Sequence, residues 1–512
     1  MKYLYRIFRY IILSSFSLLL LSPTYALERP LNDSDNFAYG ADIGWIKQLQ
    51  DEGVTWQNDD GEASDPLIIL KDHGINSVRL RVFVNPDPSA YWHKNNTTWT
   101  MLGYTDKVRV IEAAKRASQL DMRIMVDFHY SDVFADPAIQ YKPAAWVGMS
   151  VDQLIEAVSN HTRDVMSDLI AQGITPEWVQ VGNEIENGIL LPEGSPNNFR
   201  HLTSMLNAGY DAVKAISPTS KVITHLSKGT DNAKSRWFFD NFLITHGGKT
   251  DILGFSFYPY WLGQDYWNVM DALSTNLNDM AARYNKEVMV VETGGAESNP
   301  TDSYWTVKET IDAVKAVPNQ KGLGVFYWEP AAHSSVLPDG YSLGATQKID
   351  DKVLKFTIAL DAFDDVLLPP EQTERYRIIN RNSGKALNVR GGSMHDGAYI
   401  EQYGYDGWGS QHFTLVELDN GYYSIVNERS KKRFDIEANS TDDAAQTVQM
   451  TASEHHSQQW TLQQIDGVYY KIINRHSGKL LDINQASTQD GATAIQWPDN
   501  GGWNQHWQLI KN

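Results

Sequence analysis

Short apolar segments alternate with helical stretches through the first two thirds of the chain, and this alternation limits the fold more than any other feature. Eight segments lack a helical period, as expected of strands buried on both faces. They fall at 38–45, 77–84, 123–129, 178–183, 221–226, 252–258, 287–291 and 322–327. Between them, 150–171 and 198–216 carry apolar residues at helical spacing, and Ser150 with Gln153 forms a capping box.

Eight β/α units in roughly 330 residues predict an α/β fold, a (β/α)8 TIM barrel. A doubly wound open sheet is the alternative. It is disfavoured because no Gly-rich phosphate fingerprint follows the first segment.

Two glutamates close two of the predicted strands. Glu184 follows the fourth segment in EWVQVGNE, and Glu292 follows the seventh in EVMVVE. A carboxylate at the C-terminal end of a barrel strand points into the mouth of the barrel. Two such carboxylates are what glycoside hydrolysis requires, because one protonates the leaving oxygen while the other attacks the anomeric carbon or activates water. The pair therefore predicts a hydrolytic site for sugars.

Charge and cysteine content exclude several classes of protein. The 512 residues carry a formal net charge of −19, so polyanions such as nucleic acid or an anionic membrane surface are repelled. A neutral polysaccharide is not repelled. The chain has no cysteine, which excludes disulfides, thiolate metal sites and cysteine nucleophiles.

The N-terminus has the pattern of a secretory signal peptide. Lys2, Arg6 and Arg9 precede an apolar run from 11 to 21, and Ala26 ends a plausible cleavage site. We expect a signal peptide at 1–26 and an exported protein, extracellular or periplasmic. An uncleaved membrane anchor is the alternative, but the apolar run is shorter than the ~20 residues that span a bilayer.

After a linker at 364–374, the chain repeats itself three times. The interval of 47 residues is kept by Tyr376, Tyr423 and Tyr470, by Asn380, Asn427 and Asn474, and by Gln411, Gln458 and Gln505. An equal period over three copies indicates internal symmetry. The closing motifs QHF, QQW and QHW resemble those of ricin-type β-trefoil lectins, which implies an all-β trefoil domain at 375–512.

The lectin resemblance implies a sugar pocket in each repeat, formed by an Asp, a stacking aromatic and a polar pair at the closing Gln. The third repeat has all of these, in Asp482, Trp497, Asn504 and Gln505. The second keeps Asp435 but has Met450 in place of the aromatic, and the first keeps Tyr403 but has Asn388 in place of Asp. Trp460 and Trp507 are interpreted as core residues.

An ordered set of motifs connects the barrel to a known family. These are GADIGW (40–45), VRLRVFVNP (78–86), DFHYSDVFADP (127–137), KPAAW (142–146), VGNEIENGILLPEG (181–194), YPYW (258–261) and VVET (290–293). Together they closely resemble glycoside hydrolase family 53, the endo-β-1,4-galactanases, over about 37–363, within a catalytic domain at 27–363. The resemblance implies a retaining mechanism, with Glu184 as general acid and then base and Glu292 as nucleophile.

Supporting roles follow from the same resemblance. Asn183 would bind the substrate 2-hydroxyl, Arg79 would hold the nucleophile ionised, and Tyr258 would touch it. An interior ion pair is the alternative for Arg79. Substrate contacts are expected from His129, Asp132, Trp261 and Trp328; a structural hydrogen bond remains open for His129 and a core role for the tryptophans. Glu186 and Glu329 are interpreted as surface groups or as groups behind the site.

The sequence therefore predicts a secreted, retaining endo-β-1,4-galactanase that cuts the galactan side chains of pectin. Its trefoil would bind galactose-containing glycans. Alternatives are a β-mannanase or endoglucanase of the same clan, or a non-catalytic carbohydrate-binding protein. We expect a monomer with no nucleic-acid partner, no cofactor and no metal. Calcium is possible but unsupported, because the segment 331–349 has one acidic residue, Asp339.

Overall fold

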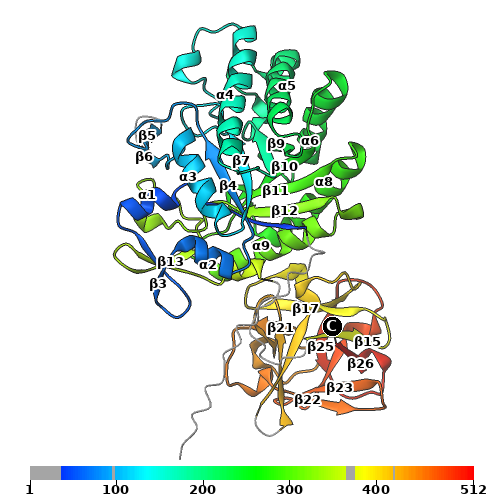
Figure 1. Ribbon diagram of the computed structural model, residues 1–512. Coiled ribbons are helices and arrows are strands. Elements are labelled where there is room, and N and C mark those ends of the chain that lie inside the picture. Colours follow the sequence, from blue (N-terminus) through cyan, green and yellow to red (C-terminus); the bar gives the residue numbers. More distant parts are fainter. Residues whose placement is uncertain (1–35, 95–97, 365–374, 419–420, 512) are drawn as a thin grey trace, which may run out of the picture. The chain divides into compact units, whose positions relative to one another are not determined.

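Eight parallel strands close into a barrel in the order β1-β12-β11-β10-β9-β8-β7-β4 (Figure 1). The computed structural model describes residues 36–94, 98–364, 375–418 and 421–511. The barrel strands are β1 (Ala38–Asp42), β4 (Ser77–Val82), β7 (Arg123–Phe128), β8 (Trp178–Val181), β9 (Lys221–Leu226), β10 (Ile252–Phe257), β11 (Glu287–Thr293) and β12 (Gly322–Tyr327). Each predicted strand is present, and the (β/α)8 barrel is confirmed. The open-sheet alternative is excluded, because β1 pairs with both β4 and β12.

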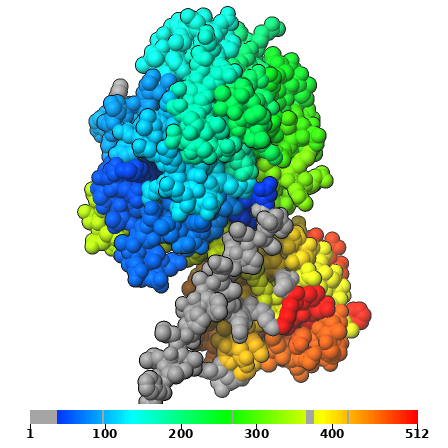
Figure 2. Space-filling model, viewed as in Figure 1, coloured from blue at the N-terminus to red at the C-terminus, as the bar shows by residue number. Residues whose placement is uncertain are grey.

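Helices cover the barrel, and in the space-filling view the segments coloured blue to green form a continuous surface over its strands (Figure 2). The helices are α1 (Ile46–Asp51), α2 (Pro66–Asp72), α3 (Lys107–Ser118), α4 (Val151–Ala171), α5 (Phe199–Ile216), α6 (Asn232–Phe239), α7 (Pro259–Leu262), α8 (Met270–Arg283) and α9 (Pro300–Lys315). The capping box predicted at Ser150 and Gln153 begins α4.

On β7, β8 and β9 the inward positions change from apolar to polar along the strand. A separate buried cluster contains Ala38, Met125, Trp178, Ile223, Ile252, Met289, Val291 and Phe326. Two residues after Met125, Trp178 and Ile223, the same strands carry Asp127, Gln180 and His225, all fully buried. Alternate residues of a strand face the same side. The apolar cluster therefore forms a floor, and the polar side chains lie above it, towards the C-terminal ends of the strands.

The described residues from 375 to 511 form an all-β domain of three similar repeats. Its strands are β15 (Arg375–Asn380), β16 (Ala386–Val389), β17 (Ala398–Tyr403), β18 (Phe413–Glu417), β19 (Tyr423–Asn427), β20 (Arg433–Ile436), β21 (Thr447–Met450), β22 (Trp460–Gln464), β23 (Tyr469–Asn474), β24 (Leu480–Ile483), β25 (Ala492–Trp497) and β26 (Trp507–Lys511). The equivalent strands β17, β21 and β25 contact one another in a ring. Phe413, Trp460 and Trp507 are fully buried, because the last residue of each closing motif packs in the shared core.

Smaller sheets complete the barrel part. A sheet of four strands has the order β13-β14-β2-β3, and β5 pairs with β6 in a hairpin. Their bounds are β2 (Thr55–Gln57), β3 (Ala63–Ser64), β5 (Tyr91–Lys94), β6 (Thr98–Met101), β13 (Thr346–Asp350) and β14 (Val353–Phe356). No helix in the described parts of the chain is long and apolar enough to cross a membrane. The predicted signal peptide and all but the first residue of the predicted linker lie outside the described residues.

Candidate active site

A cleft of about 570 Å³ opens at the C-terminal ends of the barrel strands. Both glutamates singled out in the sequence line it, together with Asn183, Tyr258 and Trp328. These residues follow or end β8, β10, β11 and β12, which belong to one barrel in the order β12-β11-β10-β9-β8. Closure of the barrel is what brings them together at the end where barrel enzymes hold their active sites.

Glu292 lies near the end of β11 and is 7% exposed. The register against β10 shifts there, because Phe255 pairs with Val290 whereas Ser256 pairs with Glu292. Such a bulge turns side chains to a new direction and is common beside active sites. Arg79 Nη2 lies 2.9 Å from Glu292 Oε1, and the Tyr258 hydroxyl donates to Oε2 at 3.3 Å. The Glu292 carboxylate is therefore held from two sides.

Arg79 connects the buried acids of the site. Its Nη1 donates to Asp42 Oδ1 at 3.1 Å, and its Nη2 donates to Asp127 Oδ2 at 2.8 Å as well as contacting Glu292. Burial disfavours the charged guanidinium, but these three carboxylates raise the pKa of Arg79 above its ordinary value. Burial raises the pKa of Glu292, and the charge of Arg79 opposes that rise. Arg79 thus forms interior ion pairs and also favours ionised Glu292.

Glu184 follows β8 in a left-handed backbone conformation, with φ 49° and ψ 58°. This region is costly for a residue with a side chain, and such strain is found mainly at functional sites. Ser256 Oγ donates to Glu184 Oε1 at 2.6 Å. Burial raises the pKa of Glu184 well above its ordinary value, and the negative charge of Glu292 raises it further. The carboxyl therefore holds its proton at pH values where an ordinary glutamate is ionised.

Asn183 is fixed beside both glutamates. Its Oδ1 accepts from Arg79 Nη2 at 2.9 Å, and its Nδ2 donates to the Ala135 carbonyl at 2.8 Å. A primary amide has two N–H donors, so one remains for a ligand hydroxyl in the cleft. The sequence predicts a fourth strand that continues to Asn183, but β8 ends at Val181. The reason is that Gly182 (φ 82°) and Glu184 (φ 49°) turn the backbone away from extended geometry.

Two residues predicted to touch substrate have other partners. His129 lines the cleft, but its Nδ1 accepts from the Ala135 N–H at 2.9 Å and its Nε2 lies 2.9 Å from Asp127 Oδ2. Asp132 does not line the cleft. Its oxygens accept from the backbone N–H groups of Asn85 and Ala144, at 2.9 and 2.8 Å. This short side chain therefore braces two loops, and its contact with substrate stays a prediction.

Aromatic rings form much of the cleft wall. Trp328 is half-buried, with its ring centroid 4.9 Å from that of Trp45 and 4.8 Å from that of Tyr341. Trp261 lies on α7 and is 63% exposed, so it is not a core residue. Both tryptophans line the cleft and present apolar faces of the kind that stack on sugar rings.

The other two glutamates near the site are buried, not on the surface. Glu329 is fully buried; it pairs with Arg81 Nη1 and accepts from the Trp45 N–H at 3.2 Å. Glu186 is 5% exposed and accepts from the N–H and hydroxyl of Ser227. Both side chains are therefore groups behind the site, as one of the two interpretations held. They are not surface groups.

Several residues that line the cleft are not among those predicted from the sequence. Trp92 and Thr100 reach the cleft from the β5–β6 hairpin, and Tyr341 reaches it from the loop after β12. The hairpin is inserted between β4 and α3, where no barrel periodicity exists. Trp92 was the sequence signal in this insertion, because an aromatic side chain there can line a sugar-binding cleft.

The third trefoil repeat brings its predicted sugar-binding residues together. Asn504 Nδ2 donates to Asp482 Oδ1 and Gln505 Nε2 donates to Oδ2, both at 2.8 Å. Burial raises the pKa of Asp482 to about 6. The ring of Trp497 is 37% exposed, and its residue pairs with Leu480 on the strand that carries Asp482.

The other two repeats differ in the same pocket. In the second, Gln458 Nε2 donates to Asp435 Oδ2 at 2.9 Å, but no aromatic stands at Met450. In the first, Tyr403 is exposed, and Asn388 Nδ2 donates to Glu401 Oε1 at 3.2 Å. Glu401 is in turn paired with Arg390. The third repeat is therefore the one with a complete set of the groups that the lectin resemblance predicts.

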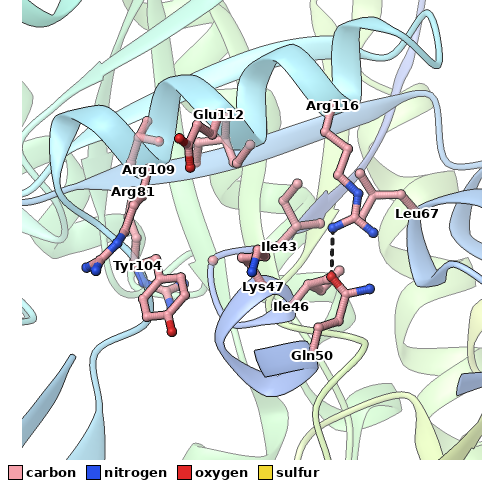
Figure 3. Close-up of a pocket in the computed structure, with 14 residues that line it drawn as sticks. Ile43, Ile46, Lys47, Gln50, Leu67, Arg81, Tyr104, Arg109, Glu112 and Arg116 are labelled. Carbon is pink, nitrogen blue, oxygen red and sulfur yellow. Dashed lines mark hydrogen bonds between the residues drawn. The ribbon is translucent and has the colours of Figure 1, made fainter. Parts of the chain in front are cut away.

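A smaller cavity of about 220 Å³ lies between α1 and α3 (Figure 3). Its cationic residues already have partners: Arg116 Nη1 donates to Gln50 at 2.9 Å, and Arg109 pairs with Asp106 at 3.1 Å. Neither glutamate of the main cleft lines this cavity. Within the described residues, no group of three or more His, Cys, Asp or Glu could hold a metal ion.

Comparison with known proteins supports this division of the chain. The model of glycosyl hydrolase family 53 matches residues 38–363, and that of the ricin-type β-trefoil lectin domain-like family matches 365–450 and 456–512. A probable arabinogalactan endo-β-1,4-galactanase A of Aspergillus terreus is 33% identical over 57% of this chain and 85% of its own. An arabinogalactan endo-β-1,4-galactanase of Thermothelomyces thermophilus is 33% identical over 56% and 88%.

The similarity extends to solved structures. A structure from a study of two fungal β-1,4-galactanases superposes with a TM-score of 0.55 at 28% identity, covering 64% of this chain and all of that one. The catalytic domain of an Ignisphaera aggregans family 53 protein gives the same TM-score and identity, covering 64% and 96%.

Proposed function

Because the chain belongs to glycosyl hydrolase family 53 and is an endo-β-1,4-galactanase, we propose that it hydrolyses β-1,4-galactan with retention at the anomeric carbon. The observation that carries this proposal is the different environment of the two glutamates in one cleft. Arg79 and Tyr258 favour the anion of Glu292, whereas Glu184 lies against a neutral serine and keeps its proton.

The chemistry follows from these environments. In the first step a Glu292 oxygen attacks the anomeric carbon, the glycosidic bond breaks, and the proton of Glu184 goes to the leaving oxygen. In the second step ionised Glu184 takes a proton from water, whose oxygen attacks the same carbon and releases Glu292. The free N–H of Asn183 is available to bind the 2-hydroxyl, a contact that strengthens in the transition state.

The trefoil is proposed to tether the enzyme to polymers that carry galactose. Asp482 accepts from the sugar hydroxyls while Trp497 covers an apolar sugar face. Tethering raises the local concentration of substrate without changing the catalytic site. We also propose that the protein acts as an exported monomer, on the basis of its N-terminal sequence and its net negative charge.

The test is hydrolysis of linear β-1,4-galactan, with β-1,4-mannan and cellulose as comparison substrates. We expect new reducing ends from galactan alone, and ¹H NMR should show the β-anomer as the first product. Glu292→Gln should lower kcat by about 10⁴-fold or more, while Glu297→Gln, outside the cleft lining, serves as the matched control. A first product with the α-anomer would disprove retention.

A further inference from the structure

The acid/base carboxyl is connected to a buried histidine through one serine hydroxyl. Ser256 Oγ donates to Glu184 Oε1 at 2.6 Å, and His225 Nε2 lies 2.8 Å from the same Oγ. Ser256 is 1% exposed and His225 is fully buried. They come from β10 and β9, and neither was identified from the sequence.

We propose that His225, as its Nε2–H tautomer, and Ser256 are positioning residues that decide which oxygen of Glu184 carries the catalytic proton. A serine hydroxyl has a single proton to donate. When His225 Nε2–H donates to Ser256 Oγ, that single proton points to Glu184 Oε1. Oε1 is then occupied as an acceptor, and the proton of Glu184 resides on Oε2. This inference rests on the proposed role of Glu184 as general acid.

The partners of the other ring nitrogen select this tautomer. His225 Nδ1 lies 3.0 Å from Asn183 Oδ1 and 3.1 Å from Gln180 Nε2. Asn183 Oδ1 already accepts from Arg79 Nη2 at 2.9 Å and from Gln180 Nε2 at 3.0 Å. Gln180 Nε2 gives its other N–H to Asp127 Oδ1 at 2.6 Å, so one N–H is left to face Asn183 Oδ1 and His225 Nδ1 together. An Nδ1–H would point at this N–H donor and would be a third donor to Asn183 Oδ1, which has two lone pairs. Nδ1 is therefore the acceptor, sharing the Gln180 N–H, and the ring proton lies on Nε2.

The charged groups around His225 keep the ring neutral. Burial lowers the pKa of His225 well below its ordinary value, and the nearby charge of Arg79 lowers it further. Asp127 raises the pKa of His225, and His129 lowers it. A neutral ring carries one proton, so the choice between Nδ1 and Nε2 sets the direction of every hydrogen bond from His225 to Glu184.

The direction matters for catalysis. Across the described residues, no hydrogen bond is found to Glu184 Oε2, and Glu184 lies where the main cleft meets a neighbouring cavity of about 260 Å³. A proton on Oε2 is free to move to a leaving oxygen. With the opposite tautomer, Ser256 would donate to His225, and Glu184 would then donate inward to Ser256. Its proton would be held away from the substrate.

The activity test compares substrates that do and do not need a proton on the leaving group. For Ser256→Ala we expect kcat/KM on β-1,4-galactan to fall at least 10-fold, a fraction of the 10²–10⁴-fold that general acid catalysis supplies. For 2,4-dinitrophenyl β-galactobioside, whose leaving group needs no protonation, kcat/KM should stay within about 2-fold. Ser220→Ala is the control, because Ser220 is as buried as Ser256 and its hydroxyl donates a hydrogen bond to the Pro176 carbonyl at 2.6 Å. Ser220 precedes the start of β9, at the end of the barrel opposite the cleft.

The pH profile and the ring itself give readouts that a merely structural role would not move. The Ser256 hydrogen bond lowers the pKa of Glu184, so Ser256→Ala should move the alkaline limb of kcat/KM to higher pH. In the ¹⁵N-labelled wild-type protein, NMR should show the proton of His225 on Nε2, with His225→Gln identifying the signal. A proton on Nδ1, or equal loss on both substrates, would overturn the proposal. Wild-type protein inactive on galactan would instead refute the proposed function.

Discussion

Replacing Arg79 by lysine is the most direct test of how the site is held together. Arg79 uses Nη1 for Asp42 and Nη2 for Asp127 and Glu292, at 3.1, 2.8 and 2.9 Å. A lysine keeps the charge but offers three protons from one point and cannot reproduce a planar fork. At least one buried carboxylate then loses its partner. An unpaired buried charge costs about 3–5 kcal/mol, so we expect the free energy of unfolding to fall by ~3 kcal/mol.

The same change should alter catalysis in a defined direction. The charge of Arg79 opposes the rise that burial causes in the pKa of Glu292. A weaker contact therefore raises that pKa, and the acidic limb of kcat/KM moves to higher pH. Loss of one preorganised electrostatic contact should lower kcat about 10²–10³-fold. The measurements are urea unfolding at neutral pH and kcat/KM on galactan from pH 3 to 9.

Arg116→Lys is the matched control, because Arg116 also has two partners, Asp65 at 2.6 Å and Gln50 at 2.9 Å, but is partly exposed outside the cleft. It should change unfolding by less than ~1 kcal/mol. An Arg79→Lys enzyme with unchanged stability and an unmoved acidic limb would show that the guanidinium does not control Glu292.

Three further predictions concern the trefoil, the barrel floor and the cleft wall. Since the pKa of Asp482 is about 6, its carboxylate accepts hydroxyls above that pH and is protonated below it; lactose affinity measured by calorimetry should fall as pH drops from 7 to 5, and Asp482→Asn should remove this dependence. Gly40→Ala would place a Cβ 2.1 Å from the Phe326 ring, so thermal unfolding should show a loss of about 1–3 kcal/mol, whereas Gly467→Ala, with open space around it, should not. Trp328→Ala should lower kcat/KM on galactan about 10-fold or more through loss of a stacking face worth ~1.5 kcal/mol, with the dinitrophenyl substrate as a check that the catalytic pair is intact.

Much of the fold could be predicted because it depends on local patterns. Apolar runs such as 252–257 and the capping box before α4 record short-range preferences that the barrel keeps. The ends of the strands could be predicted less accurately than their existence. The predicted strand 287–291 stopped before Glu292, whereas β11 continues to Thr293 through a bulge. A bulge depends on the neighbouring strand, so the sequence of β11 alone does not reveal it.

Site residues were predictable where a motif carried them. Glu184, Asn183 and Glu292 are in short motifs at strand ends, and the structure places all three in one cleft. Asp132 belongs to an equally clear motif but braces backbone N–H groups. A side chain two residues further along a loop can point in any direction, and only the packed loop decides which.

By itself, the sequence determined which segments form strands and helices, how many there are, and the three-fold repeat. The reason is that periodicity and turn chemistry act over a few residues at a time. Tertiary structure alone decided which buried polar groups meet. Ser256 and His225 stand on separate strands, in no motif, and contact Glu184 and Asn183 because β9 pairs with both β8 and β10 in the barrel. In that dry interior each hydrogen bond must find a partner, so packing fixes the direction of the bonds as well as the positions of the atoms.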